Sequence, residues 1–113
     1  MPDYSQDPQV IPYLLYEDAG AAMDWLIRAF GFAERVRQQH DDGTVRHGEL
    51  QLDGGGVIMM GTPGGDFRGP ARLGAATQLV CITVTDLSAH RERARDYHWD
   101  CTGYAAPWPP EEH

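Results

Sequence analysis

Two stretches of the chain repeat the same order of hydrophobic and polar positions. Residues 10–16 and residues 78–84 are short runs rich in apolar side chains, which is typical of β-strands. Each run leads into an aspartate and then into a helical pattern, which predicts helices over 19–30 and 87–97. The first copy continues into further predicted strands, over 32–40, 44–52 and 57–62. The pattern therefore predicts a complete βαβββ module followed by the start of a second one.

Particular residues mark the ends of these elements. Asp18 and Asp86 can each accept a backbone hydrogen bond as the N-cap of a helix. Gly31 can end the first helix, and Asp-Gly at 42–43 predicts a hairpin turn. Pro12 lacks an N–H donor, which places the first strand at a sheet edge or at a strand start. The predicted apolar stripe of the first helix consists of Ala22, Trp25, Leu26, Ala29 and Phe30.

The second copy stops early, and this sets the predicted organisation of the chain. We expect a flexible arm over 1–9, the first module over 10–62 and a Gly- and Pro-rich connecting loop over 63–76. The second module begins over 77–98 and is followed by an irregular tail over 99–113, whose prolines each remove a backbone donor. Three more strands need roughly 15–20 residues before turns are counted, so the second module is too short to be complete.

Composition and charge narrow the function classes. The chain has 113 residues, which suits one compact domain with a real core. Its formal net charge of −8 disfavours nucleic acid and anionic membranes as partners. The N-terminus is polar and acidic, unlike a signal peptide, and no apolar run reaches membrane-spanning length. We expect a cytoplasmic protein, with Cys81 buried in its strand and neither cysteine in a CxxC pair.

The order of elements and several short segments resemble the vicinal oxygen chelate superfamily, which includes glyoxalase I, extradiol dioxygenases and bleomycin resistance proteins. The segments that carry the resemblance to its glyoxalase-like branch are Val10–Asp18, Ala29–Phe32, His47–Leu50, Val57–Met60 and Gln78–Asp86. The resemblance implies an α+β fold in which two βαβββ modules curve around a shared cavity. It covers about three quarters of the chain, with the second module truncated.

Metal-dependent members of that superfamily place His, Gln or Glu ligands on the first and last strands of each module. The corresponding positions here hold Ile11, Leu79, and Met60 or Gly61. Gln78 is one residue out of register, and a slip of one residue moves a side chain to the opposite face of a strand. The resemblance therefore predicts no metal cofactor, because these positions lack the carboxylate or imidazole ligands that a divalent ion prefers.

His47 and Glu49 are the most informative polar pair. They lie two residues apart on a predicted strand, so both project to one face, which we expect Val45 and Gln51 to share. On a concave face they could orient a ligand, act as acid and base, or bind a metal if His40 reached them. The alternative is a solvent-facing pair, because alternation does not tell which face is concave.

Other candidates for ligand contact come from the strand pattern. Tyr13 shares a face with Ile11, where the resemblance places the cavity, and Met59 and Gln78 are further candidate lining residues. Trp25 is expected to pack in the core. His90 lacks partners at ligand spacing and is expected to be solvated.

Three functions remain open at this point. The first is a protein that binds a small apolar or aromatic molecule without a metal. The second is a metal-dependent lyase or dioxygenase of the same superfamily, and the third is a truncated product with no independent activity. Because a half-built module leaves an open sheet edge, we expect a homodimer. A ferredoxin-like α+β barrel is the alternative fold, although it needs strands after residue 98.

Overall fold

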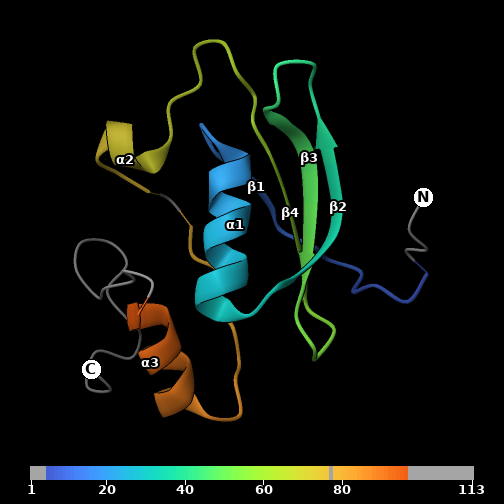
Figure 1. Ribbon diagram of the computed structural model, residues 1–113, viewed down its shortest axis with the longest axis vertical. Coiled ribbons are helices and arrows are strands. Elements are labelled where there is room, and N and C mark those ends of the chain that lie inside the picture. The colour runs from blue at the N-terminus through green and yellow to red at the C-terminus, as the bar shows by residue number, and fades with distance from the viewer. Residues whose placement is uncertain (1–4, 77, 97–113) are drawn as a thin grey trace.

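The structure is a computed structural model, and it describes residues 5–76 and 78–96. It shows an α+β fold in which the predicted order of strand, helix and three strands is confirmed (Figure 1). The elements are β1 (Tyr13–Leu15), α1 (Ala19–Phe30), β2 (Ala33–Gln39), β3 (Val45–Gln51), β4 (Val57–Gly61), α2 (Pro70–Leu73) and α3 (Leu87–Asp96).

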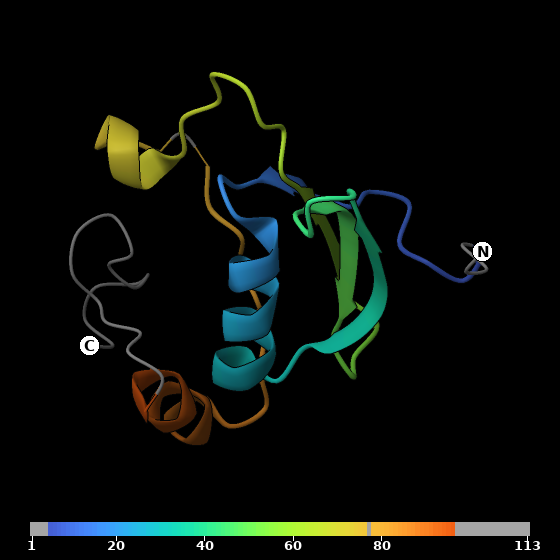
Figure 2. The same cartoon turned by 45° about the horizontal axis from the view of Figure 1, so that its top comes forward.

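The four strands form one mixed sheet in the order β1-β4-β3-β2. Strand β1 pairs with β4 in parallel, and the other neighbours are antiparallel. The edge position predicted from Pro12 is confirmed, because β1 begins at the next residue and lies at one end of the sheet. Helix α1 covers one face of the sheet, and Figure 2 shows the opposite face turned away from every helix.

Helix α1 begins and ends where local signals predict. The Asp18 side chain accepts a hydrogen bond of 3.0 Å from the Ala21 N–H. Gly31 ends the helix in the left-handed conformation, with φ of 79°, a value that glycine adopts without steric cost. Together they satisfy backbone groups that would otherwise have no partner at the two ends of the helix.

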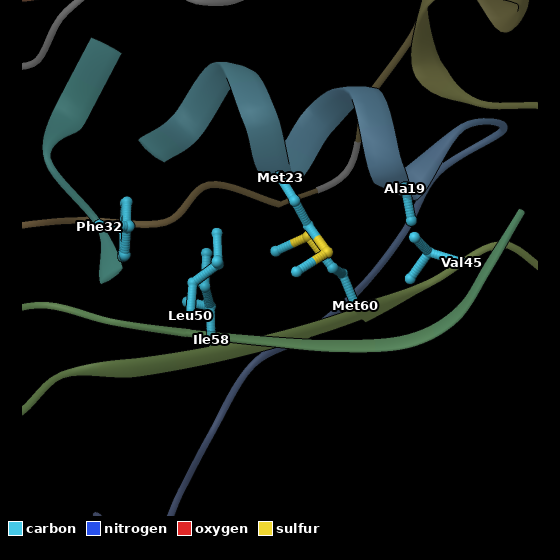
Figure 3. Packing of buried hydrophobic residues seen from close by; sticks show 7 residues of the cluster. All are labelled: Ala19, Met23, Phe32, Val45, Leu50, Ile58 and Met60. Atoms are coloured by element: carbon cyan, nitrogen blue, oxygen red, sulfur yellow. The ribbon is translucent and has the colours of Figure 1, made fainter. Parts of the chain in front are cut away.

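The hydrophobic core lies between α1 and the sheet (Figure 3). Its fully buried members include Met23 of α1 together with Leu50 and Met60 of the sheet. Met23 was missing from the predicted stripe, and Gly48 explains its position, because a Cβ at residue 48 would overlap the Met23 side chain. The full cluster is Ala19, Met23, Phe32, Val45, Leu50, Ile58 and Met60.

Trp25 lies outside this central cluster. Its ring meets Phe30 edge-on, with ring centroids 5.1 Å apart. Leu26 and Phe30 of the predicted stripe are half-buried against the core. The apolar side chains of α1 therefore cover a wider part of the helix surface than the predicted stripe.

A bulge in β3 overturns one predicted orientation. Gln38 pairs with His47, and the next residue of β2, Gln39, pairs with Val45, so Arg46 is an extra residue. Val45 therefore joins the core beneath α1, with 1% of its surface exposed. The prediction that Val45 shares a face with His47 was wrong, because strand alternation breaks at a bulge.

Residues 78–84 form no strand, contrary to the prediction. Within the described residues β1 pairs with β4 alone, so this segment adds nothing to the sheet. Cys81 is consequently exposed rather than buried. The predicted loop 63–76 also contains the short helix α2. The tail 99–113 lies outside the described residues.

Helix α3 is confirmed and contacts the C-terminal end of α1. Asp86 accepts a hydrogen bond of 3.0 Å from the Ala89 N–H. Arg93 donates to the Arg28 carbonyl at 2.8 Å, which satisfies a helix-end acceptor of α1. His90 stacks on Phe30 with centroids 5.1 Å apart, so it is only partly solvated rather than fully so as expected. None of the helices in the described part of the chain is long and apolar enough to cross a membrane.

Candidate functional site

The candidate residues Tyr13, His47, Glu49 and Met59 lie on the sheet face that α1 leaves uncovered. Gly48 faces α1, so its neighbours His47 and Glu49 point to the other side. In the register of the sheet Met59 is paired with Glu49 on one side and with Tyr13 on the other. Side chains at paired positions project to the same face. The register thus brings residues from three strands into one cross-strand row.

A chain of hydrogen bonds joins Tyr13, His47 and Glu49. The Tyr13 hydroxyl lies 2.9 Å from His47 Nδ1, and His47 Nε2 lies 2.8 Å from Glu49 Oε2. The two rings are stacked, with centroids 5.6 Å apart and an interplanar angle of 26°. The Glu49 side chain is fully buried and that of His47 is 24% exposed. These hydrogen bonds therefore connect the protein surface to a buried carboxylate.

Gly61 leaves the space through which Tyr13 reaches His47. Tyr13 belongs to β1, and its ring must pass over β4 to contact β3. A Cβ at residue 61 would lie 3.0 Å from the Tyr13 hydroxyl and 2.7 Å from the carbonyl oxygen of Arg46. Glycine is thus required here for close approach, although its backbone needs no unusual φ.

Two charged residues complete the surroundings of Glu49. Arg35 Nε of β2 lies 3.8 Å from Glu49 Oε1, and Arg35 Nη1 lies 3.1 Å from Asp7 Oδ2. A fully buried carboxylate is costly unless it is paired and hydrogen-bonded. Arg35 and His47 supply such partners, which explains how Glu49 is accommodated inside the protein. Asp7 connects the N-terminal segment to the same network.

The sequence pattern identified neither Arg35 nor Asp7. Arg35 lies at an irregular register shift in β2, between Glu34 and Val36, so simple alternation does not assign its face. Asp7 precedes every predicted element and looks like an ordinary charged residue near a chain end. Only the fold brings it to β2.

Gln78 lies near Tyr13 at the open edge of β1. The two residues line a small cavity of about 120 Å³. Its walls are formed by Pro12, Tyr13, Leu14, Gln78, Leu79 and Val80. Ligand pockets are usually about 300–1,000 Å³, so this cavity is smaller than a complete site for a drug-sized molecule.

The donor groups on this face are hydrogen-bonded to one another. Both ring nitrogens of His47 are engaged, one with Tyr13 and one with Glu49. Among residues 5–76 and 78–96, no group of three or more His, Cys, Asp or Glu side chains is placed to hold a metal ion. Met60, at a position where the resemblance expects a ligand, is fully buried in the core.

The chemistry of the site depends on the proton positions on His47. A histidine bonded to both a carboxylate and a hydroxyl can hold or pass a proton between them. A neutral ring has one donor and one acceptor nitrogen, whereas a charged ring has two donors. The arrangement can therefore orient a polar group of a ligand at Tyr13.

Comparison with known proteins identifies relatives in two mycobacteria. No protein-family model matches the chain. Over 92 residues, 78% of this chain, it is 32% identical to uncharacterized protein Mb0911c of Mycobacterium bovis and to uncharacterized protein MT0910 of Mycobacterium tuberculosis. The matched region spans 60% of the first relative and 54% of the second. The chain thus corresponds to little more than half of each.

A solved structure shares the fold. The crystal structure of TioX from Micromonospora sp. ML1 superposes with a TM-score of 0.60 at 32% sequence identity. The match covers 82% of this chain and 72% of that chain. The α+β architecture described above is therefore that of TioX over most of both chains.

Proposed function

We propose, from the premise that the chain belongs to the same family as TioX, that it binds a small apolar or aromatic molecule without a metal. The binding surface is the sheet face that carries Tyr13, His47 and Met59. The observation that supports this most strongly is the hydrogen-bond chain from half-exposed Tyr13 to buried Glu49. The proposal assigns the protein to the vicinal oxygen chelate type of small-molecule binder.

The physical argument rests on the mixture of groups on this face. Small-molecule sites combine aromatic and apolar walls with a few oriented polar groups. Tyr13 is 46% exposed and offers a ring, Met59 offers an adaptable apolar side chain, and His47 offers a polar contact. A buried ionised network beneath a surface without function would have a cost and no evident benefit.

A metal-dependent lyase or dioxygenase is the second candidate. It needs ligands at positions that hold Ile11, Leu79 and Met60, and it needs the nitrogens of His47 that are already hydrogen-bonded. Metal-free binding therefore agrees better with the donor groups on this face.

A second copy of the chain is the proposed partner at the open edge of β1. Within the described residues that edge has no paired strand, and Leu15 and Leu79 are 47% and 67% exposed. An unpaired edge next to apolar side chains favours association. Light scattering that finds a stable monomer at high protein concentration would contradict this.

Titration with the neutral fluorescent aromatic N-phenyl-1-naphthylamine tests the binding proposal. We expect a saturable rise in fluorescence, weakened roughly tenfold by Tyr13→Ala because an aromatic contact is lost. Leu73→Ala is the matched control, since Leu73 is 58% exposed on α2 and lies outside the site. Equal loss in both variants would contradict the location. A stoichiometric divalent ion that disappears on His47→Ala would favour the second candidate.

A further inference from the structure

The charged groups around His47 determine which protons its ring nitrogens hold. The fully buried Glu49 lies 2.8 Å from Nε2. Beyond it lies Arg35, 3.8 Å from the other carboxylate oxygen and itself paired with Asp7. Arg46, next to His47 in the chain, has its guanidinium bonded to a glutamine of β2. The ion-pair distance to Arg35 and the short contact with His47 favour the carboxylate form of Glu49, which only accepts hydrogen bonds.

This charge arrangement sets the direction of the hydrogen bonds. Because Glu49 only accepts, His47 Nε2 must carry a proton and donate it. In the neutral ring Nδ1 is then the acceptor, so the Tyr13 O–H donates inward to His47. The hydroxyl proton of Tyr13 is therefore engaged in the hydrogen bond to His47. Its oxygen presents only lone pairs to a molecule on the exposed side.

We infer that the ligand carries an N–H or O–H donor, as phenols and aromatic amines do, and contacts the oxygen of Tyr13 with it. This inference rests on the proposed function, because it names the chemical class of the molecule bound at the same face. An anionic ligand would meet those lone pairs on a chain of net charge −8. A neutral or cationic aromatic donor fits both the charge and the hydrogen-bond direction.

Three naphthalene probes test this on the unmodified protein. One, 2-naphthol, carries a donor, whereas 2-methoxynaphthalene and 2-acetylnaphthalene have only acceptors. At about pH 7.5 we expect 2-naphthol to bind about fivefold more tightly than 2-methoxynaphthalene, the ratio that one neutral hydrogen bond supplies. 2-Acetylnaphthalene also lacks a donor, so it too should bind more weakly than 2-naphthol.

Two variants locate the effect. Tyr13→Phe keeps the ring and should bring 2-naphthol and 2-methoxynaphthalene to equal affinity. His47→Ala removes the acceptor of the Tyr13 proton and should reduce the preference for 2-naphthol, because the Tyr13 O–H can then donate outward. Saturable binding of all three probes with equal affinity would overturn the inference while leaving the proposed function in place. Absence of saturable binding by any probe would overturn both.

Discussion

The two faces of the sheet differ in how they are stabilised, although they are built from the same strands. On β3, Gly48 and Leu50 face α1 and belong to an apolar interface, whereas His47 and Glu49 face the opposite side and belong to a polar network. The first face is covered by a helix, and its side chains need only the shape and volume that fill the space beneath that helix. On the second face each buried polar atom needs a particular partner.

Within β3, the side chains that stabilise the core and those of the candidate site therefore lie on opposite faces. Apolar burial is non-directional and roughly proportional to area, so many sequences could fill the face beneath α1. A buried carboxylate is tolerated only with correctly placed donors, here His47 and Arg35. Such an arrangement restricts which residues are allowed at these positions.

The strongest destabilisation is expected from a substitution on the apolar face. Leu50→Ala should lower the free energy of unfolding by about 3 kcal/mol, because a fully buried leucine leaves a cavity. Urea unfolding followed by circular dichroism measures this. Leu15→Ala, at a 47% exposed position of β1, is the control and should change the same quantity far less. Equal losses would mean that the core is not where the structure places it.

A smaller effect is expected for the neighbouring position on the polar face. Glu49→Gln keeps the volume but removes the charge, and should cost about 2 kcal/mol, a typical value for a hydrogen bond to a charged group. Urea unfolding of the single variants and of the double variant Glu49→Gln with His47→Gln measures the coupling. Strictly additive losses would show that the pair does not interact.

Gly61 tests the path of the Tyr13 ring. Gly61→Ala should cost about 1.5 kcal/mol, because the new methyl group meets both the Arg46 carbonyl and the Tyr13 hydroxyl. It should also weaken binding of N-phenyl-1-naphthylamine. Gly54→Ala is a matched control, since a Cβ at residue 54 meets nothing within 4 Å. The idea fails if both substitutions have the same effect on thermal unfolding.

The smallest effect concerns the pH dependence of the contact between α1 and α3. Burial, and then the nearby charge of Arg93, lower the pKa of His90 below its ordinary value of 6.5. The unfolded chain therefore binds more protons than the folded one as the pH falls below about 6.5. The contribution of His90 to the free energy of unfolding should be fully present above about pH 6.5. It should decrease as the pH falls and level off below the pKa that His90 has in the folded protein. His90→Phe should remove this component from the measured pH profile of unfolding.

Local features of the fold could be predicted from the sequence because their causes are local. The Asp18 cap, the Gly31 stop and the Asp42-Gly43 turn each depend on the backbone preferences of single residues. The order of elements followed from the same signals. The strand over 78–84 was predicted wrongly because alternation indicates only that a segment can form a strand, and this segment forms no ladder with the open edge of β1.

That His47 and Glu49 share a face also followed from the sequence, since they lie two residues apart on one strand. The fold was needed to show that this face is the one opposite α1, and that the bulge at Arg46 sends Val45 to the other side. The contact between Tyr13 and His47 spans 34 positions of the chain. Strand register and burial arise from distant segments meeting in space, whereas periodicity reports only on neighbours in the chain.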